Sequence, residues 1–112
     1  MEDLLDINGD LIKPDEYIIM ALPCGRSTSK LQRGRVTELK RNTDGSIKNL
    51  TVRIPSISYV KDPATLSYNY AVGFRSIKLK ELYSERFILD PRGHEFEMKA
   101  LERLENDYIK RG

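Results

Sequence analysis

The chain of 112 residues contains one cysteine, one histidine and no tryptophan. Because Cys24 has no second cysteine to pair with, no internal disulfide forms. A single unpaired cysteine is typical of proteins in a reducing compartment. Zinc sites need three or four cysteine, histidine or acidic ligands at short spacing. A Cys–His catalytic pair would have to bring Cys24 to His94, 70 positions away. We therefore expect no catalytic residue, no metal ion and no cofactor, and we predict that the chain is not an enzyme.

Long apolar runs are also missing. No stretch approaches the roughly 18 apolar residues that a transmembrane helix needs. The start, Met1 to Asp6, is acidic, whereas a secretory signal begins with basic residues and continues with an apolar segment. With 39% apolar and 32% charged residues, the composition is that of a folded domain. We expect an intracellular, cytoplasmic protein with no membrane partner.

Positive charge is concentrated in the middle of the chain. The net charge is −5 over residues 1–22, +9 over residues 23–80 and −2 over residues 81–112, for a total of +2. This block predicts one of two arrangements: a basic face open to a partner, or basic strands that the acidic ends cover and neutralise. The sequence does not choose between them.

The first part of the chain predicts a hairpin and a strand. Asn8-Gly9 lies between apolar residues and is a strong signal for a tight hairpin turn. Asp6 to Asp10 also resembles the opening of a calcium loop, but its glycine comes fourth rather than sixth. The hairpin interpretation is therefore preferred. Glu16 to Leu22 is nearly all apolar and indicates a buried strand.

A long hairpin is predicted in the middle of the chain. Residues 31–41 and 46–54 form its two arms, and in the second arm apolar and polar residues alternate. Gly34 inside the first arm indicates a bulge or a close backbone approach. Residues 55–69 contain Lys61-Asp62-Pro63, which breaks regular structure, so we predict a long loop or a distorted excursion there.

Later residues predict a closing strand region and a helix. Alternation resumes over residues 68–80, then one helical turn is expected at 81–84 and a short strand at 86–89. Asp90-Pro91 is typical of a helix start, with an acidic N-cap before proline at the first helical position. Apolar residues at three- and four-residue spacing then indicate an amphipathic helix. Its predicted partner-binding stripe comprises Phe96, Leu101, Leu104 and Tyr108.

The order of these elements resembles an SH3-like small β-barrel. The segment around Gly34-Arg35-Val36 resembles the early glycine-containing strand of KOW and Tudor-type barrels, and Ser76 to Leu89 resembles their closing strand, turn and strand. The resemblance covers roughly residues 7–89. It implies binding of RNA, DNA, peptides or subunits of larger complexes, and the fold does not choose among these.

We therefore predict a mainly β protein: an SH3-like antiparallel barrel or bent sheet with one C-terminal α-helix. The β domain spans residues 1–90, and the amphipathic helix spans residues 91–112 and packs on it or on a partner. The segment from Gly25 to Val36 also resembles small uncharacterised phage-encoded proteins, which implies a viral origin and a host-cytoplasm location.

Two binding functions remain open. The first is a protein-interaction module that docks on a larger host or virion complex, for which the helix stripe is the expected surface. The second is RNA or DNA binding through a basic hairpin face, with Tyr59, Tyr68 and Tyr70 available for stacking. The basic residues expected to contact nucleic acid are Arg26, Lys30, Arg33, Arg35, Lys40, Arg41, Lys48 and Arg53. We expect a protein partner in preference to nucleic acid.

Overall fold

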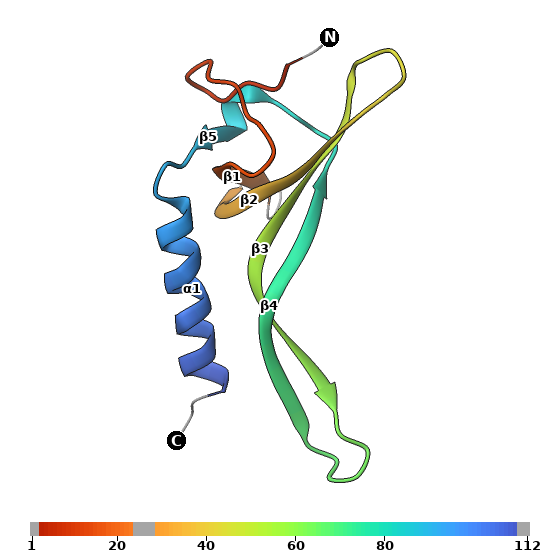
Figure 1. The fold of residues 1–112 in the computed structure, drawn as a ribbon, viewed down its shortest axis with the longest axis vertical. Coiled ribbons are helices and arrows are strands. Elements are labelled where there is room, and N and C mark those ends of the chain that lie inside the picture. Colours follow the sequence, from red (N-terminus) through yellow and green to blue (C-terminus); the bar gives the residue numbers. More distant parts are fainter. Residues whose placement is uncertain (1–2, 24–28, 110–112) are drawn as a thin grey trace.

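The computed structural model describes residues 3–23 and 29–109. Five strands and one long helix form an elongated molecule of 53 × 31 × 29 Å (Figure 1). The elements are β1 (Tyr17–Pro23), β2 (Ser29–Arg41), β3 (Ile47–Lys61), β4 (Tyr68–Leu79), a 3-10 turn (Ser84–Arg86), β5 (Phe87–Leu89) and α1 (Gly93–Tyr108).

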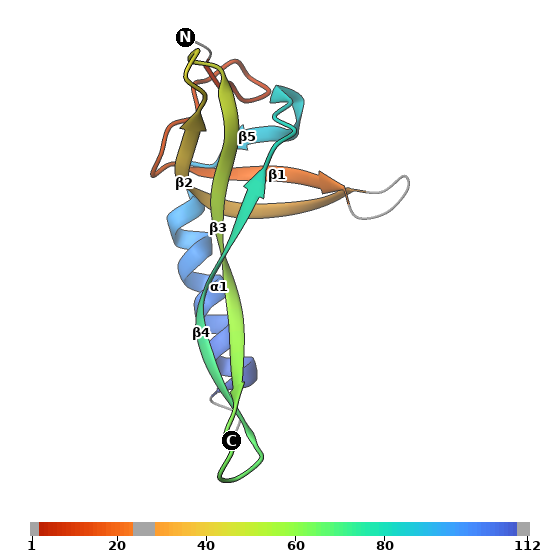
Figure 2. The same cartoon turned by 90° about the vertical axis from the view of Figure 1, so that its right-hand side faces the viewer.

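All five strands belong to one antiparallel sheet of order β4-β3-β2-β1-β5. In the described part of the chain β4 does not pair with β5, so the sheet stays open. The predicted fold class is thereby confirmed: the protein is mainly β, with a sheet rather than a closed barrel and one C-terminal helix. Figure 2 shows that β1 and the first part of β2 run across the direction of β3 and β4, whereas the second part of β2 turns to run alongside β3, so the sheet is strongly bent.

One face of the sheet carries the hydrophobic core. Period-two alternation and the strand register put side chains from all five strands on this inner face, and the N-terminal segment covers it. The buried residues of the core are Leu4, Ile12, Ile18, Met20, Val36, Leu50, Val52, Ile54 and Phe87. Because the core lies on this side, the opposite, outer face carries the alternate residues of every strand, including the central arginines.

The N-terminal segment is held by a buried carboxylate. The turn at Asn8-Gly9 forms as predicted, with Gly9 at a φ of 83° and a single bridge between Leu5 and Leu11. Inside this turn the Asp6 carboxylate accepts backbone N–H bonds from Asn8 and Asp10 at 2.9 Å and from Leu89 at 3.0 Å. The last bond ties the segment to β5, 83 positions along the chain. The acidic side chain therefore serves as a structural acceptor.

The interpretation of residues 55–69 as a loop or distorted excursion was wrong. β3 continues to Lys61 and β4 begins at Tyr68, so only residues 62–67 connect them. The two strands stay in register from Leu50↔Leu79 to Lys61↔Tyr68. Their far part, toward the connection at residues 62–67, projects from the body of the molecule (Figure 1). Pro55 is tolerated because β2 has left β3 by this point, so its missing N–H faces no strand. We refer to residues 55–74 as the arm.

The helix also differs in detail from its sequence prediction. α1 begins at Gly93, two residues after Pro91, and its N-cap is Arg92 rather than Asp90, without a side-chain capping bond. The expected helical turn at 81–84 forms as a 3-10 turn at Ser84–Arg86 instead. Gly93 is buried because the helix starts directly against β1: a Cβ at this position would collide with Cβ and Cγ of Tyr17.

Gly34 lies close against β3, one residue before the β2–β3 ladder begins. A Cβ at this position would overlap the Val52 side chain and lie 2.9 Å from the backbone oxygen of Arg53. The sequence left open a bulge or a close approach, and close approach is what forms at Gly34. The register shift in this hairpin lies further along, between Val36 and Glu38.

This contact generates a stability prediction. Gly34→Ala should destabilise the protein by about 1–3 kcal/mol, because backbone cannot move aside as a flexible side chain can. Gly73→Ala in β4 is the matched control, since a Cβ there meets no atom within 4 Å. Urea unfolding of both variants measures the difference; equal stabilities would show that the strands do not approach this closely.

A pH prediction follows from Asp6. The pKa of its carboxyl is lowered, chiefly by the hydrogen bond from the Leu89 N–H. A lowered folded-state pKa contributes stability above the unfolded value, about 3.9, and that contribution is lost as the pH falls through the folded-state pKa. Asp6→Asn should therefore flatten the acid limb of the stability profile below about pH 4. The exposed Asp3→Asn is the control, and an unchanged acid limb in Asp6→Asn would contradict the assignment.

Candidate interaction surfaces

Three arginines of the predicted basic face lie together on the outer face of the sheet. Arg35 of β2 pairs directly with Arg53 of β3, and Arg33 lies two residues before Arg35 on the same face. This is the arrangement that alternation predicts. The face is not open, however, because α1 packs over it, and each arginine has an acidic partner from outside the basic block.

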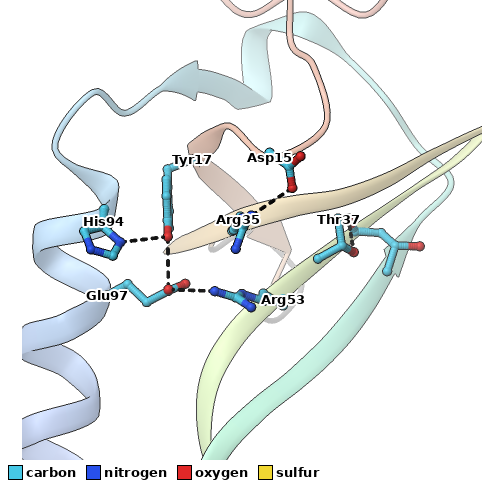
Figure 3. A network of polar contacts seen from close by, with 8 residues as sticks. Asp15, Tyr17, Arg35, Thr37, Arg53, His94 and Glu97 are labelled. Carbon is cyan, nitrogen blue, oxygen red and sulfur yellow. Dashed lines mark hydrogen bonds and ion pairs between the residues drawn. The ribbon is translucent and has the colours of Figure 1, made fainter.

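The centre of this contact is Glu97, which is 7% exposed (Figure 3). Its Oε1 accepts a hydrogen bond from the Tyr17 hydroxyl at 3.0 Å and another from Arg53 Nη2 at 3.0 Å. A buried carboxylate is costly unless donors compensate it, and here one oxygen receives two. The network therefore joins α1 to β1 and to β3 at one point.

Tyr17 and His94 extend the network. Burial, reinforced by the hydrogen bond to Glu97, raises the pKa of the Tyr17 hydroxyl. The same hydroxyl lies 3.2 Å from His94 Nδ1. Because its one proton is donated to Glu97, the histidine must donate from Nδ1 if this contact is a hydrogen bond. This contact places His94, in the first turn of the helix, beside the network.

The other two arginines also lie near acidic side chains, Arg35 beside the exposed Asp15 and Arg33 beside the buried Asp90. Arg35 Nη2 donates to Asp15 Oδ1 at 2.8 Å, and Arg33 Nε lies 3.7 Å from the buried Asp90 carboxylate. Arg33 also stacks its guanidinium over the Phe96 ring, 3.6 Å from the centroid. Of the two arrangements that the charge distribution allowed, these residues adopt the second, in which the acidic ends cover the basic strands.

The rest of the predicted basic set is dispersed. Lys40 and Lys48 are exposed near the turn of the β2–β3 hairpin, and Arg41 there donates to the Gly45 carbonyl oxygen at 3.0 Å. Lys30 lies at the opposite end of β2, on a groove described below. Arg26 falls outside the described residues. The structure therefore divides the set among three places rather than presenting one basic face.

Most of the predicted helix stripe faces the sheet. Phe96, Leu101 and Leu104 are half-buried, whereas Tyr108 at the end of α1 is exposed. Sequence periodicity identified the apolar side of the helix, but the long hairpin that receives it was missing from the prediction. The stripe is therefore partly covered within the chain, and Phe96 and Leu104 also line the groove described below.

Tyr108 instead joins an aromatic cluster on the arm. Tyr59 packs edge-on against Tyr68 with ring centroids 5.2 Å apart and lies 6.1 Å from Tyr70, which in turn lies 5.8 Å from Tyr108. All four rings remain exposed, Tyr59 to 63%. We call these four residues the tyrosine patch. The sequence proposed three of its members for stacking, and the fold adds Tyr108 from the helix.

A groove opens where β2 separates from β3 beneath α1. It has a volume of about 850 Å³, within the usual range for ligand pockets. Its lining residues come from β2, from the helix, from Tyr17 of β1 and from Pro55 at the base of the arm. Sequence reasoning missed this groove, because the separation of the two strands depends on the bend of the sheet.

Neither a metal centre nor a membrane span is found in the described residues. There, no three histidine, cysteine or acidic side chains gather as a metal site would require, and no helix has the length and apolarity to span a membrane. Cys24 lies outside the described residues, so its position relative to His94 is not defined.

Comparison with known proteins returns no relative: no protein family, no curated protein and no solved structure matches this chain. The function is therefore inferred from the residues and their geometry.

The central network generates a prediction about stability. Glu97→Gln keeps the size of the side chain but removes the charge that compensates Arg53, and should cost about 2–3 kcal/mol of unfolding free energy. Glu102→Gln, on an exposed position of the same helix, is the control. In a double-mutant cycle with Arg53→Met, the two losses should not add, because each variant breaks the same contact. Additive losses would show that these side chains do not interact.

Proposed function

We propose that this chain is a non-catalytic binding module that engages a protein partner through the tyrosine patch on the arm. The observation that supports this most is the position of the patch. Three of its four exposed rings lie on a two-stranded projection that extends away from the core, and the fourth, Tyr108, lies beside them at the end of α1 (Figure 1).

The arm is poorly explained by the needs of folding alone. An isolated two-stranded hairpin is only marginally stable in water, and a domain gains little core by extending one. Tyrosine is enriched at protein interfaces, where it buries a large ring at low cost in side-chain entropy and keeps a hydroxyl for hydrogen bonding. An exposed tyrosine cluster on such a projection therefore favours a contact with another protein.

RNA or DNA binding remains the second candidate. It is supported by tyrosine rings that stack bases readily and by the exposed Lys40 and Lys48. The ion pairs of Arg33, Arg35 and Arg53 weigh against it, because these cations already have carboxylate partners. A protein partner is therefore the preferred proposal, consistent with the SH3-like resemblance and with docking on a larger host or virion complex.

Site-specific photo-crosslinking tests the proposal. A benzophenone amino acid at Tyr59 should form an adduct with one protein species in the cells that make this chain. The same group at Asn69, which the strand register places on the opposite face of the arm, is the matched control. Irradiation after nuclease treatment and in high salt should give the same adduct, because a mainly apolar contact between proteins forms without nucleic acid and is little screened by salt. An adduct that nuclease treatment before irradiation prevents, or equal yields from both faces, would contradict a protein-binding patch.

Substitutions within the patch sharpen the test. Tyr59→Ser with Tyr68→Ser should weaken partner binding by roughly 30-fold or more, the loss typical of interface hot spots. The midpoint temperature of thermal unfolding should barely change, since both rings are more than half exposed. Tyr83→Ser, an equally exposed tyrosine outside the arm, should leave the affinity unchanged.

A further inference from the structure

The side of β2 that faces the groove is an open strand edge. The ladder between β2 and β3 begins at Arg35↔Arg53, whereas the pairing of β2 with β1 continues to Ser29. Within the described residues, the first part of β2 therefore has a neighbouring strand on one side only. Figure 2 shows β2 running with β1 away from the line of β3 and β4.

The direction of the backbone hydrogen bonds along β2 identifies which of its N–H and carbonyl groups face no neighbouring strand. Val36 turns both its N–H and its carbonyl oxygen toward the β1 side, bonding Glu16 at 2.8 Å and Asp15 at 2.7 Å. Because successive residues of an antiparallel strand alternate in direction, Leu31 and Arg33 turn their backbone groups to the side that β3 has left. Pro55 of β3 has no N–H to offer across the gap.

The groove follows this edge rather than a face of the sheet. Gln32, Arg33 and Gly34 all line it, although consecutive strand residues point to opposite faces. A groove that touches three consecutive residues must therefore run along the backbone. Leu31, at the same edge, is 74% exposed. An open edge with an exposed apolar residue is a template for another strand.

The walls of the groove indicate the chemistry of its occupant. Phe96, Ala100 and Leu104 of α1 supply an apolar side. Four cations line the groove against one acid, Glu97, whose Oε1 is occupied by Tyr17 and Arg53. The cations are Lys30, Arg33, Lys99 and Arg103. Among them, Lys30 and Arg103 have no carboxylate within ion-pair distance in the described part of the chain.

We propose that this groove binds an extended acidic peptide segment, which adds to the open edge of β2 as a further strand. The peptide backbone pairs with Leu31 and Arg33, its acidic side chains meet Lys30 and Arg103, and its alternate apolar side chains pack on Phe96 and Leu104. This surface is separate from the tyrosine patch, so the inference goes beyond the proposed function and does not depend on it.

The test begins with a displayed library of random linear peptides selected on the whole protein. The selected peptides are expected to carry acidic residues that alternate with apolar ones. Affinity is then measured by fluorescence anisotropy for the best peptide and for two copies of it, each N-methylated at one of the two alternating sets of residues. Losing the backbone donors on one edge should weaken binding roughly tenfold or more, whereas methylating the other set should have little effect. Equal losses for the two copies would overturn strand addition.

Charge variants locate the site. Arg103→Glu and Lys30→Glu should each weaken the peptide at least fivefold, whereas Lys78→Glu, an exposed cation on β4 outside the groove, should not. Because all three lie on the surface, circular dichroism and thermal unfolding should match the parent protein. Tyr59→Ser with Tyr68→Ser should leave peptide affinity unchanged, which separates failure here from failure of the tyrosine patch.

Three results would overturn the proposal. The first is a selection without enrichment of acidic peptides. The second is affinity that does not respond to Arg103→Glu or Lys30→Glu. The third is tighter binding of a single-stranded oligonucleotide than of the selected peptide, with the same response to both variants, since that would identify the groove as a polyanion site without strand pairing.

Discussion

One oxygen of Glu97 accepts hydrogen bonds from Tyr17 and from Arg53, and the position of α1 depends on that contact. The three side chains come from the helix, from β1 and from β3, so the network joins elements 80 and 44 positions apart in the sequence. It sits where the helix starts against the sheet, beside Gly93, which leaves no room for a side chain next to Tyr17. Removing the carboxylate would leave Arg53 over the Phe74 ring as a partly buried cation without its acidic partner.

Because α1 covers part of the outer face of the sheet, it changes which surfaces are available for binding. Three arginines of the basic block, Arg33, Arg35 and Arg53, lie beneath or beside the helix, where Asp90, Asp15 and Glu97 are their acidic partners. Two surfaces that the helix leaves accessible are the tyrosine patch on the arm and the groove at the open edge of β2. Both owe their existence to the bend of the sheet, because the strands separate where β1 and β2 turn away from β3 and β4 (Figure 2). The same distortion thus produces a projecting arm and an unpaired edge.

The sequence predicted what depends on local pattern. Alternation identified most strands, Asn8-Gly9 identified the first turn, and period-two spacing placed Arg33, Arg35 and Arg53 on one face. It did not predict the arm, because Pro55 and Lys61-Asp62-Pro63 are breakers by composition. Pro55 costs little at a position that needs no donor, and Pro63 falls in the connection between the strands. The partners of the arginines were also unpredictable, since each comes from a segment whose place depends on the whole fold.

Hydrogen exchange followed by mass spectrometry tests the central claim, that Glu97 holds the helix on the sheet. In the parent protein, the amides of Lys99 to Leu104 should be protected nearly as well as those of β1. In Glu97→Gln, protection of this helical segment should fall strongly while β1 and β5 keep theirs, because the core on the inner face does not need the helix. Unchanged helix protection in Glu97→Gln would contradict the account, since α1 would then be held by contacts other than this network.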